Sequence, residues 1–480
     1  MTYVSPQASF REAQAHSPQG SAPSPRWRGD RNVFDTIGKP GAAALSHVPG
    51  RKGLPLLGIL PQAVLDPLKF VGGMHERYGR VYRFYACGSW NVHAIGPEAN
   101  ELVLFDRDSI FSAHGGWSPV IEPFFPGALL IQDGERHRAN RRILGEAFRQ
   151  QKVEGYQALL DREIEASVAS WIGRDIDVYD EVKRLTLRIA ATTFLGIEIG
   201  SRTDAAMAAF GDMMKALTAL SHNPWLSRTA RRGYRGKAYL ERFILDLVAE
   251  KRRAPGDDIL SRICHLQGDD GAPLSDREIH DSIIFLLAAA HDTMASGLTS
   301  VLFYLGCAPD WQARLRNEID GAALARPVAA ATAPLPLQDM CFKEALRLNA
   351  TAPVIWRRAT RPFNLYGYDL PAGTITGVSP MLVHLDPEIW EDPAKFDPLR
   401  FTPEAEAARH RHAFVPFGGG VHKCLGLHFS RQQARIFITR LLSSADIAIE
   451  KPEKARWYHW PNCRPRGRLV ARISAALPKR

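Results

Sequence analysis

The feature that most constrains this chain is a glycine-rich stretch that places a cysteine next to the start of a helix. The stretch runs from Phe414 to Phe429 and reads FVPFGGGVHKCLGLHF, so that Cys424 follows three consecutive glycines closely. Backbone N–H groups and the helix dipole at such a position favour the thiolate over the thiol. The glycines at positions 418, 419, 420 and 426 remove side chains where a flat cofactor would lie close. A cysteine at a helix start is in general a nucleophile, a redox thiol or an inert packing residue, and the surrounding pattern must decide between these.

That pattern is F-x-x-G-x-H-x-C-x-G, and it is met in full at Phe417, Gly420, His422, Cys424 and Gly426. The ten-residue signature resembles the heme-binding loop of the cytochrome P-450 family, the heme-thiolate monooxygenases. The resemblance implies that heme b is the cofactor and that Cys424 is its iron ligand. A thiolate ligand donates electron density to heme iron and favours O–O cleavage. Phe417, Gly418 and Gly426 would lie beside the heme.

Two further motifs resemble the structural core of the same family. Glu344-Ala-Leu-Arg347 matches its ExxR helix, and residues at i and i+3 share one helix face and can pair. Such a pair alone says little, because most are surface ion pairs. However, Arg400 follows at the expected distance in the stretch FDPLRF, with Leu399 where the family usually has glutamate. The resemblance implies that Glu344, Arg347 and Arg400 form a structural triad.

A third motif, Ala289-Ala-His-Asp-Thr293, lies inside a long apolar segment and resembles the family's oxygen-activating motif. The Thr293 hydroxyl is expected to donate back to the Ala289 carbonyl, which would open a local groove for dioxygen and water. An acid beside an alcohol in an apolar helix is costly unless it is used. The resemblance implies that Thr293 assists dioxygen activation and that Asp292 relays protons. Ala290 replaces the commoner glycine, and His291 is interpreted as an ordinary helix residue.

Heme propionates are anionic and need cationic or donor partners. The resemblance supplies them from three places in the chain: His137 and Arg141 in the HxxxR helix, Arg357 after the ExxR helix, and His422 before the cysteine. Pro49-Gly50 with Pro55 and Gly58 also resembles the family's proline-rich entry. The matches run in the family's order from Pro49 to about residue 435, and so cover nearly the whole folded part.

Length and periodicity predict one large domain. The 480 residues are 45% hydrophobic and 23% charged, which is typical of a globular protein. Residues 1–46 are rich in Ser, Pro, Gln and Ala and are expected to be a disordered extension, and residues 47–480 a single, mainly α domain with minor β sheet. The heme would lie between the long central helix and the cysteine-loop helix. Helices are predicted at 136–149, 153–171, 181–195, 235–252, 276–304, 308–319, 337–348 and 425–442, strands at 81–87, 90–95 and within 363–379, and a loop at 111–127.

Several classes of protein are disfavoured by composition. No apolar run approaches the ~18–20 residues of a spanning helix, so no integral membrane segment is expected. The net charge of +10 is concentrated in the last thirty residues, which hold nine basic residues and one acidic, but no nucleic-acid-binding motif accompanies them. Six irregularly spaced cysteines indicate neither a disulfide framework nor a zinc site. A cytoplasmic location is expected, with a mitochondrial one as the alternative.

The partners follow from the same resemblance. They are a small hydrophobic substrate, O2 and a separate ferredoxin or flavodoxin-type electron donor, because the chain has no dinucleotide loop and no clustered cysteines. The donor would dock on a basic face made by Lys423, His428, Arg431 and Arg435. The three-glycine loop resembles members that act on sterols, retinoids or other terpenoids, and a fatty-acid-like substrate is also open. The predicted pocket residues are Trp117, Val120, Phe124, Phe125, Phe285, Ala289, Thr293, Val354, Ile355 and Trp356.

Two alternatives remain open, and a third is remote. One is a heme-thiolate peroxygenase or isomerase that needs no electron donor, although such members often lack the acid and alcohol seen at Asp292 and Thr293. Another is a heme-binding sensor or carrier without catalysis, which would gain nothing from that pair. A cysteine-nucleophile hydrolase is disfavoured, because no oriented His/Asn pair is recognisable.

Overall fold

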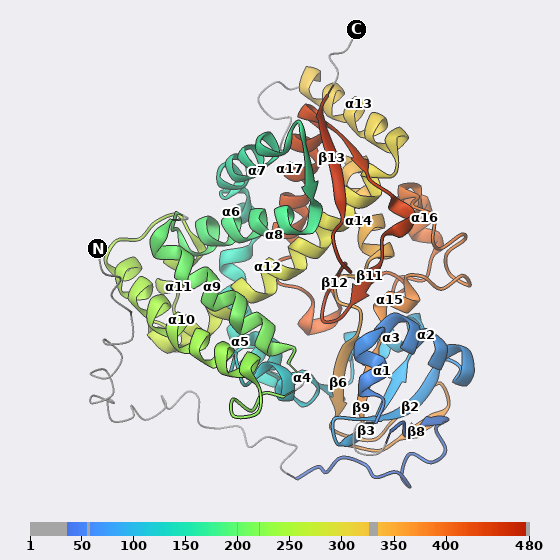
Figure 1. Ribbon diagram of the computed structural model, residues 1–480. Helices are drawn as coiled ribbons and strands as arrows, with labels where there is room; N and C mark the ends of the chain where they lie inside the picture. The colour runs from blue at the N-terminus through green and yellow to red at the C-terminus, as the bar shows by residue number, and fades with distance from the viewer. Residues whose placement is uncertain (1–35, 55–57, 199, 220, 326–334, 477–480) are drawn as a thin grey trace, which may run out of the picture. The chain divides into compact units, whose positions relative to one another are not determined.

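The longest helix, α12, spans Asp276–Gly306 and runs through the middle of the unit that extends from Lys39 to Arg480 (Figure 1). The structure is a computed structural model, and it describes residues 36–54, 58–198, 200–219, 221–325 and 335–476. The Ser275 hydroxyl accepts from the Glu278 N–H, and the Glu278 carboxylate accepts from the Ser275 N–H in return. This reciprocal cap fixes the residue at which α12 begins.

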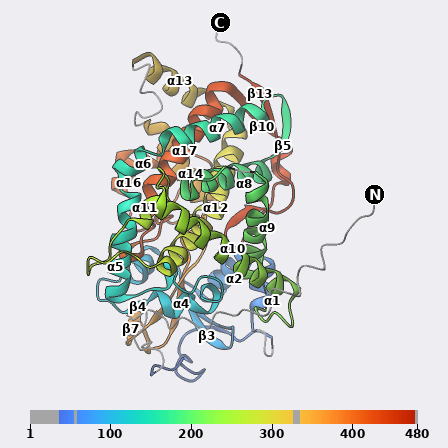
Figure 2. The same cartoon turned by 90° about the vertical axis from the view of Figure 1, so that its left-hand side faces the viewer.

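Helices from both halves of the chain surround α12. Its neighbours include α8 (Val178–Ile189), α10 (Arg228–Arg253), α14 (Pro336–Leu348) and α17 (Leu427–Ser444). Figure 2, turned by 90°, again places α12 among these helices. Buried side chains follow one another along most of its length, from Ile279 to Leu305. A helix that is apolar on nearly every side is stable only inside a protein or a bilayer.

The length and apolar character of α12 also meet the criteria for a membrane-spanning helix. Its most apolar 18-residue window has a mean hydropathy of 1.2, but 67% of that window is buried inside the protein. The sequence predicted no membrane-spanning segment, and the structure refines this prediction. One described helix has the required length and composition, and its burial is typical of the central helix of a globular core.

The remaining helices follow in chain order. They are α1 Leu60–Leu65, α2 Pro67–Tyr78, α3 Pro97–Asn100, η5 Glu101–Phe105, α4 Ala113–Ile121, η6 Leu129–Ile131, α5 Gly134–Gly145, η7 Glu146–Phe148, α6 Gln150–Glu154, α7 Gln157–Trp171, η8 Ala190–Leu195, α9 Ser201–Leu217, α11 Ile259–Cys264, α13 Pro309–Ala325, α15 Pro380–Val383, η9 Pro398–Phe401, α16 Pro403–Ala408, η10 Gly420–His422 and η11 Pro452–Lys454.

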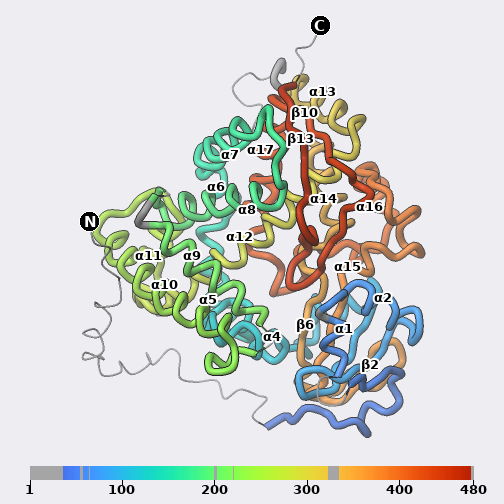
Figure 3. Tube along the Cα trace, in the orientation of Figure 1, coloured from blue at the N-terminus to red at the C-terminus, as the bar shows by residue number. Residues whose placement is uncertain are grey.

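The sheets are small and lie outside the helical core. The largest has six strands in the order β1 (Gly50–Arg51), β2 (Val81–Ala86), β3 (Ser89–Ala94), β9 (Ile375–Val378), β6 (Ile355–Ala359) and β4 (Phe111–Ser112). It joins segments far apart in the sequence, as the blue and orange parts of the tube in Figure 3 show. The other sheets pair β10 (Ala445–Ile449), β13 (Val470–Ala475) and β5 (Arg174–Asp177), then β11 (Trp457–His459) with β12 (Cys463–Pro465), and β7 (Phe363–Leu365) with β8 (Tyr368–Leu370).

The predicted mainly α fold with minor sheet is confirmed, as are the long helices and the hairpin around Gly88. The loop predicted for residues 111–127 is wrong in part, because residues 113–121 form α4. The Ser112 hydroxyl caps this helix by accepting from the Gly115 N–H, although Pro119 lies inside it. Helix α9 and the C-terminal strands were not expected from the sequence at all.

The N-terminal boundary predicted at residue 47 lies within the part of the chain that the structure describes. Residues 1–35 lie outside the described residues, as does Pro55, so the extension predicted for residues 1–46 is visible only from Thr36. The described stretch 36–46 contains turns and no helix or strand, but Leu45 is buried with Val81 and Val92. The boundary at residue 47 stays a prediction.

A fully buried ion pair on α14 connects the core to the loops that follow. The Arg347 guanidinium donates to both Glu344 carboxylate oxygens, at 2.7 and 2.8 Å, and neither side chain is exposed. Arg400 Nε lies 3.5 Å from Glu344 Oε1, and the Asp397 N–H donates to the same oxygen. The structure therefore brings the three predicted triad residues together.

The same pair holds the segment of the chain that leads into the cysteine loop. Arg347 donates to the carbonyls of His384, at 2.8 Å, and Lys395, at 3.2 Å. His384 Nε2 in turn accepts from the Val415 N–H at 3.1 Å, two residues before Phe417. Burial lowers the pKa of His384 to about 3, so the imidazole is neutral and can accept this bond. Arg347 is thereby linked to the cysteine loop through a single histidine.

We expect Glu344→Gln to destabilise the holoprotein strongly, because it leaves the buried Arg347 charge without its counter-ion. Breaking a buried pair on one side costs roughly 3–5 kcal/mol. The thermal midpoint of the heme-loaded protein would fall by several degrees, and heme release on heating would begin earlier. Glu165→Gln is the matched control, because its contact with Arg440 lies at the surface. An unchanged midpoint for Glu344→Gln would contradict the structural role of the pair.

Candidate functional site

The cysteine loop is shaped by its glycines. Gly418 and Gly420 have φ angles of +67° and +58°, which L side chains rarely adopt. A Cβ on Gly420 would also overlap the Leu104 carbonyl, and one on Gly419 would lie 2.6 Å from the Phe105 ring. The loop thus packs its backbone directly against η5 (Glu101–Phe105).

Cys424 closes this loop ahead of α17. Its N–H donates to the Phe417 carbonyl at 2.9 Å, and Gly426 is the N-cap of α17. The Cys424 side chain retains accessible surface, yet protein surrounds its thiol, so this surface faces an interior space. The predicted placement of Cys424 at a helix start, with Phe417 and Gly426 beside it, is thus reproduced in the structure.

The ionisation of Cys424 differs from the sequence expectation. Burial raises the pKa of the thiol, and this outweighs the lowering by the Gly426 N–H, Arg141 and Lys423. The position of Cys424 at a helix start is therefore not enough to favour the thiolate over the thiol. A bound metal ion deprotonates a coordinating thiol outright, so iron would supply the missing stabilisation.

Four cationic or donor side chains gather next to the loop. The rings of His137 and His422 stack at a centroid distance of 4.0 Å, and Arg141 donates to the Lys423 carbonyl. His422 Nε2 lies 3.7 Å from Asp133 Oδ1. Arg357 is 5% exposed, and the structure gives its guanidinium one hydrogen bond, to the carbonyl of Trp356. The structure therefore brings together the residues predicted to bind propionates.

The positive character of this cluster is costly to bury. Burial lowers the pKa of Arg357 to about 10, and burial together with His422 and Arg141 lowers the pKa of His137 to about 3. Among the described residues no carboxylate lies within ion-pair distance of Arg357, and His137 Nε2 is buried without a hydrogen-bond partner. An anionic group between these residues would offset the buried Arg357 charge and accept a hydrogen bond from His137 Nε2. The residues present thus fit a heme with its propionates.

The predicted oxygen-activating motif faces the interior from α12. The Thr293 hydroxyl donates to the Ala289 carbonyl at 2.6 Å, as expected from the sequence. Ala289 is exposed by its accessible area, and Ala290 and Thr293 are half-buried, although most of α12 is buried. A small exposed residue inside a core helix marks the wall of an internal space.

Asp292 points elsewhere. Its Oδ1 lies 3.4 Å from Lys183 Nζ on α8 and 3.6 Å from His291 Nε2. Lys183 is 42% exposed, so it connects the carboxylate to solvent. His291 is buried and its Nδ1 lies 3.1 Å from the Thr186 hydroxyl. Sequence reasoning missed both Lys183 and the contacts of His291, because Lys183 lies more than a hundred positions from Asp292 in the chain.

The predicted pocket residues fall into two groups. Trp117, Phe285, Val354 and Ile355 are partly exposed, and Ile355 Cδ1 comes within 3.9 Å of the place of a Cβ on Gly418. Phe124 and Phe125 are fully buried. Phe124 stacks on Tyr234 of α10 at 5.0 Å, and Phe125 meets the edge of Phe285 at 5.9 Å. These two support the wall from behind, and their contact with substrate stays a prediction.

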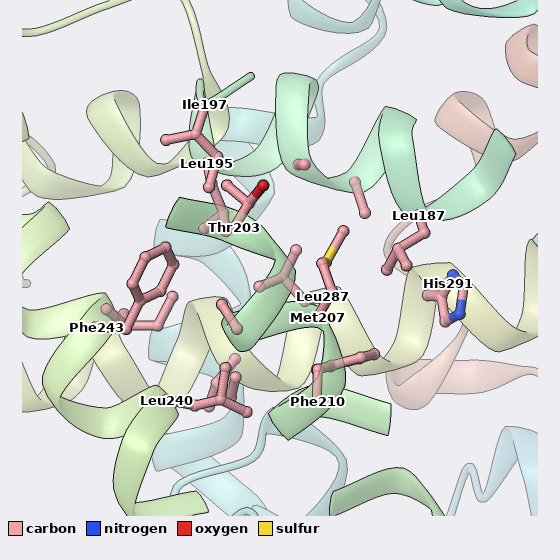
Figure 4. A pocket seen from close by; sticks show the side chains of 15 residues that line it. Leu187, Leu195, Ile197, Thr203, Met207, Phe210, Leu240, Phe243, Leu287 and His291 are labelled. Atoms are coloured by element: carbon pink, nitrogen blue, oxygen red, sulfur yellow. The ribbon is translucent and has the colours of Figure 1, made fainter. Parts of the chain in front are cut away.

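A separate apolar cavity lies on the opposite face of α12 (Figure 4). Its empty volume is about 450 Å³, part of which is open to solvent. Ile284, Leu287 and His291 line it from α12, and at 100° per residue this face is turned away from that of Phe285 and Ala289. The other lining residues come from α8, η8, α9 and α10 and their connections, and none of the predicted pocket residues is among them.

Comparison with known proteins agrees with this geometry. The family model described as Cytochrome P450 matches residues 48–457. A putative cytochrome P450 136 of Mycobacterium tuberculosis is 36% identical over 428 residues, which cover 87% of this chain and 86% of the relative. A pentalenene oxygenase of Streptomyces avermitilis is 29% identical over 438 residues, which cover 88% of this chain and 96% of the relative.

Solved structures give the same result. A retinoic acid-bound cyanobacterial CYP120A1 matches with a TM-score of 0.82 and 27% identity, over 89% of this chain and 99% of that one. A cytochrome P450DA heme domain matches with a TM-score of 0.80 at 20% identity, covering 90% of this chain and 98% of that one. The second likeness concerns the fold alone.

Replacing Cys424 by alanine should remove the thiolate signature and leave the fold intact. We expect the reduced, carbon monoxide-treated wild type to show a strongly red-shifted Soret band, because thiolate donation alters the iron's electronic structure. In Cys424→Ala this band would be absent. Cys307→Ala is the control, since Cys307 lies at the end of α12 and away from the loop. Persistence of the shifted band in Cys424→Ala would exclude this residue as the ligand.

Proposed function

The chain belongs to the cytochrome P450 family of heme-thiolate monooxygenases, and we propose that it inserts one oxygen atom from O2 into a hydrophobic, isoprenoid-type substrate. The insertion would be a hydroxylation or an epoxidation. The electrons would come from a separate protein donor of the ferredoxin or flavodoxin type. Heme b, when bound, supplies the redox chemistry that activates dioxygen.

The observation that carries the substrate proposal is that apolar side chains on α12 and β6 are partly exposed near Thr293 and the cysteine loop. Phe285 and Ala289 of α12 would form an apolar wall in front of Thr293, and Ile355, which lies near Gly418 at the start of β6, would join it. Trp117 of α4 joins it because its neighbour Gly116 packs on the Trp356 backbone. A wall of this kind stabilises a bound hydrocarbon through burial, at about 25 cal/mol per Å² of apolar surface.

Two relatives favour an isoprenoid over a fatty acid. One is named a pentalenene oxygenase, and one solved structure holds retinoic acid. Pentalenene and retinoic acid are both isoprenoid compounds with compact or rigid carbon skeletons. The indole N–H of Trp117 is buried without a hydrogen-bond partner among the described residues. It would donate a hydrogen bond to one polar group of such a substrate.

Within the site, Thr293 and Asp292 have separate tasks. The Thr293 hydroxyl is held by the Ala289 carbonyl and presents its oxygen as an acceptor toward the interior. The Asp292 carboxylate receives a proton on the side of α8, where the Lys183 ammonium reaches solvent. Rotation of the Asp292 side chain would then bring the proton to the Thr293 side of the helix. The apolar wall would exclude water while protons arrive from the side of α8.

The electron donor would approach the cysteine loop from outside. Of the four residues predicted to form the docking face, Lys423 and His428 are exposed, whereas Arg431 lies 3.6 Å from the Asp339 carboxylate. Arg435 is half-buried. The basic face that supports this proposal is therefore smaller than the sequence suggested, and it centres on Lys423.

Substrate titrations test the proposed class. Retinoic acid, a sesquiterpene hydrocarbon and palmitic acid would be titrated into the heme-loaded protein while the Soret spin-state shift is followed. We expect an isoprenoid to bind at least ~10-fold more tightly than palmitic acid, and Phe285→Ala to weaken its binding ~5-fold or more by removing buried contact. Ile284→Ala on the opposite face is the matched control. Tighter binding of palmitic acid, or equal effects of the two variants, would overturn the proposal.

Substitutions at Thr293 and Asp292 separate the two tasks. Thr293→Ala should retain heme and substrate binding but lower the product formed per O2 consumed, because the hydroxyl no longer stabilises the reacting oxygen. Asp292→Asn should slow turnover by ~10²-fold, typical of a lost proton-transfer group, and raise the solvent isotope effect. The measurements are oxygen uptake, product yield and rates in H2O and D2O. Turnover with peroxide alone at the full rate would instead favour a peroxygenase.

A further inference from the structure

We propose that Glu101, His410 and His412 form a binding site for a divalent metal ion of the zinc class, separate from the heme. One ligand atom from each of these residues lies within 4.8 Å of those of the other two. Glu101 begins η5, and the two histidines lie in the turn that precedes the cysteine loop. The site is independent of the monooxygenase reaction.

His412 is held in the orientation that a ligand needs. Its ring is 97% buried and lies 4.1 Å from the Phe105 ring, with 30° between the two planes. Its carbonyl accepts from the buried Asn100 side-chain amide at 3.0 Å. A ligand that is fixed by packing and hydrogen bonds loses little entropy when it binds a metal ion.

The free nitrogen of His412 points at the other two residues. Its Nδ1 is buried without a hydrogen-bond partner among the described residues, and Glu101 Oε2 lies 3.4 Å away, longer than an ordinary hydrogen bond. Burial lowers the pKa of His412, in keeping with a neutral imidazole. An unpaired buried nitrogen facing a carboxylate oxygen is a site that a metal ion would complete.

His410 is exposed, and its ring can turn once its bond to the backbone between the two histidines is released. Its Nδ1 accepts from the His412 N–H at 3.2 Å, which leaves Nε2 available. The two rings are 5.5 Å apart. In a tetrahedral zinc site with bonds of about 2.0–2.1 Å, ligand atoms are roughly 3.4 Å apart. Rotation of the exposed His410 ring supplies the contraction that remains.

The charged residues around the site determine which Glu101 oxygen is left for the metal ion. Arg107 and Arg411 contact Glu101 Oε1 at 3.1 and 3.3 Å, so Oε2 is the oxygen left for the metal ion. Both guanidiniums are about two-thirds exposed, and solvent weakens their repulsion of a cation. On the other side, the Glu98 carboxylate is close enough to His410 for the histidine to lower its pKa, and it adds a negative charge.

The ligand set selects the kind of ion. Imidazole nitrogens suit zinc, copper and nickel, whereas magnesium and calcium require oxygen ligands. Two imidazoles and one carboxylate leave a fourth position for water. The bound ion would tie η5 to the turn before the cysteine loop, and the Gly419 and Gly420 backbone already rests on Phe105 and Leu104 of η5. Metal binding would therefore stiffen the loop that holds Cys424.

Calorimetric titration of the heme-loaded protein with Zn²⁺ tests the proposal. We expect one tight site per chain, no comparable binding of Mg²⁺, and a thermal midpoint that rises with Zn²⁺. His410→Ala and Glu101→Gln should each weaken binding at least ~10-fold. Because His410 is exposed, its variant should keep the wild-type carbon monoxide spectrum, which excludes misfolding as the cause.

Arg411→Gln is the matched control in the same turn. It keeps all three ligands and removes a positive charge, so Zn²⁺ should bind several-fold more tightly than in the wild type. The proposal is overturned if the wild type has no single tight site. It is also overturned if His410→Ala binds Zn²⁺ as the wild type does, since the ion would then be held by other histidines of the chain.

Discussion

The Glu344–Arg347 ion pair is the interaction on which the cysteine loop depends. Removing both charges from water carries a large desolvation penalty, and the pair is favourable only if every remaining lone pair and N–H finds a partner. The structure supplies such partners from the backbone of His384, Lys395 and Asp397. Because these partners come from the segment between α14 and the cysteine loop, satisfying the pair forces that segment to wrap around α14. The position of Cys424 follows from this, through the bond between His384 and the Val415 N–H.

The cluster next to Cys424 has the opposite character, because its charges are not balanced within the protein. Asp133 is the carboxylate closest to His422, and it also caps the start of α4 by accepting from the Ser112 hydroxyl and the Ala113 N–H. Asp133 and Asp106 both raise the pKa of Arg357, but burial outweighs them, and the half-buried Arg141 adds a further positive charge. Such an excess destabilises the protein until an anion binds, and local violations of this kind are concentrated at functional sites. Heme propionates would supply that anion, and cofactor binding would then be coupled to folding stability.

Sequence reasoning succeeded where the chemistry is local. The Thr293 bond to Ala289 and the Glu344–Arg347 pair depend on helical spacing of four and three residues, which can be read directly. It failed where tertiary contacts determine the local structure or the pKa of a side chain. Residues 113–121 contain two glycines and a proline, yet they form α4, in part because Gly116 must approach the Trp356 backbone. The pKa of Cys424 was expected to fall and instead rises, because desolvation depends on surroundings that the local sequence does not reveal.

The proposed roles of Thr293 and Asp292 would assign both the exclusion of water and the delivery of protons to one helix. Successive residues are rotated by 100°, so Asp292 and Thr293 are adjacent in the chain but directed toward different surroundings. Thr293 bonds to the carbonyl beside the apolar wall, whereas Asp292 meets Lys183 on α8, whose ammonium reaches solvent. In the proposed mechanism, a proton would pass from the side of α8 to Thr293 through one rotation of the Asp292 side chain, and the apolar wall would not have to open to water. Burial lowers the pKa of His291 to about 4, so its imidazole is neutral. Its Nε2 lies 3.6 Å from Asp292 Oδ1, but without a positive charge it does not compete with Lys183 as a counter-ion.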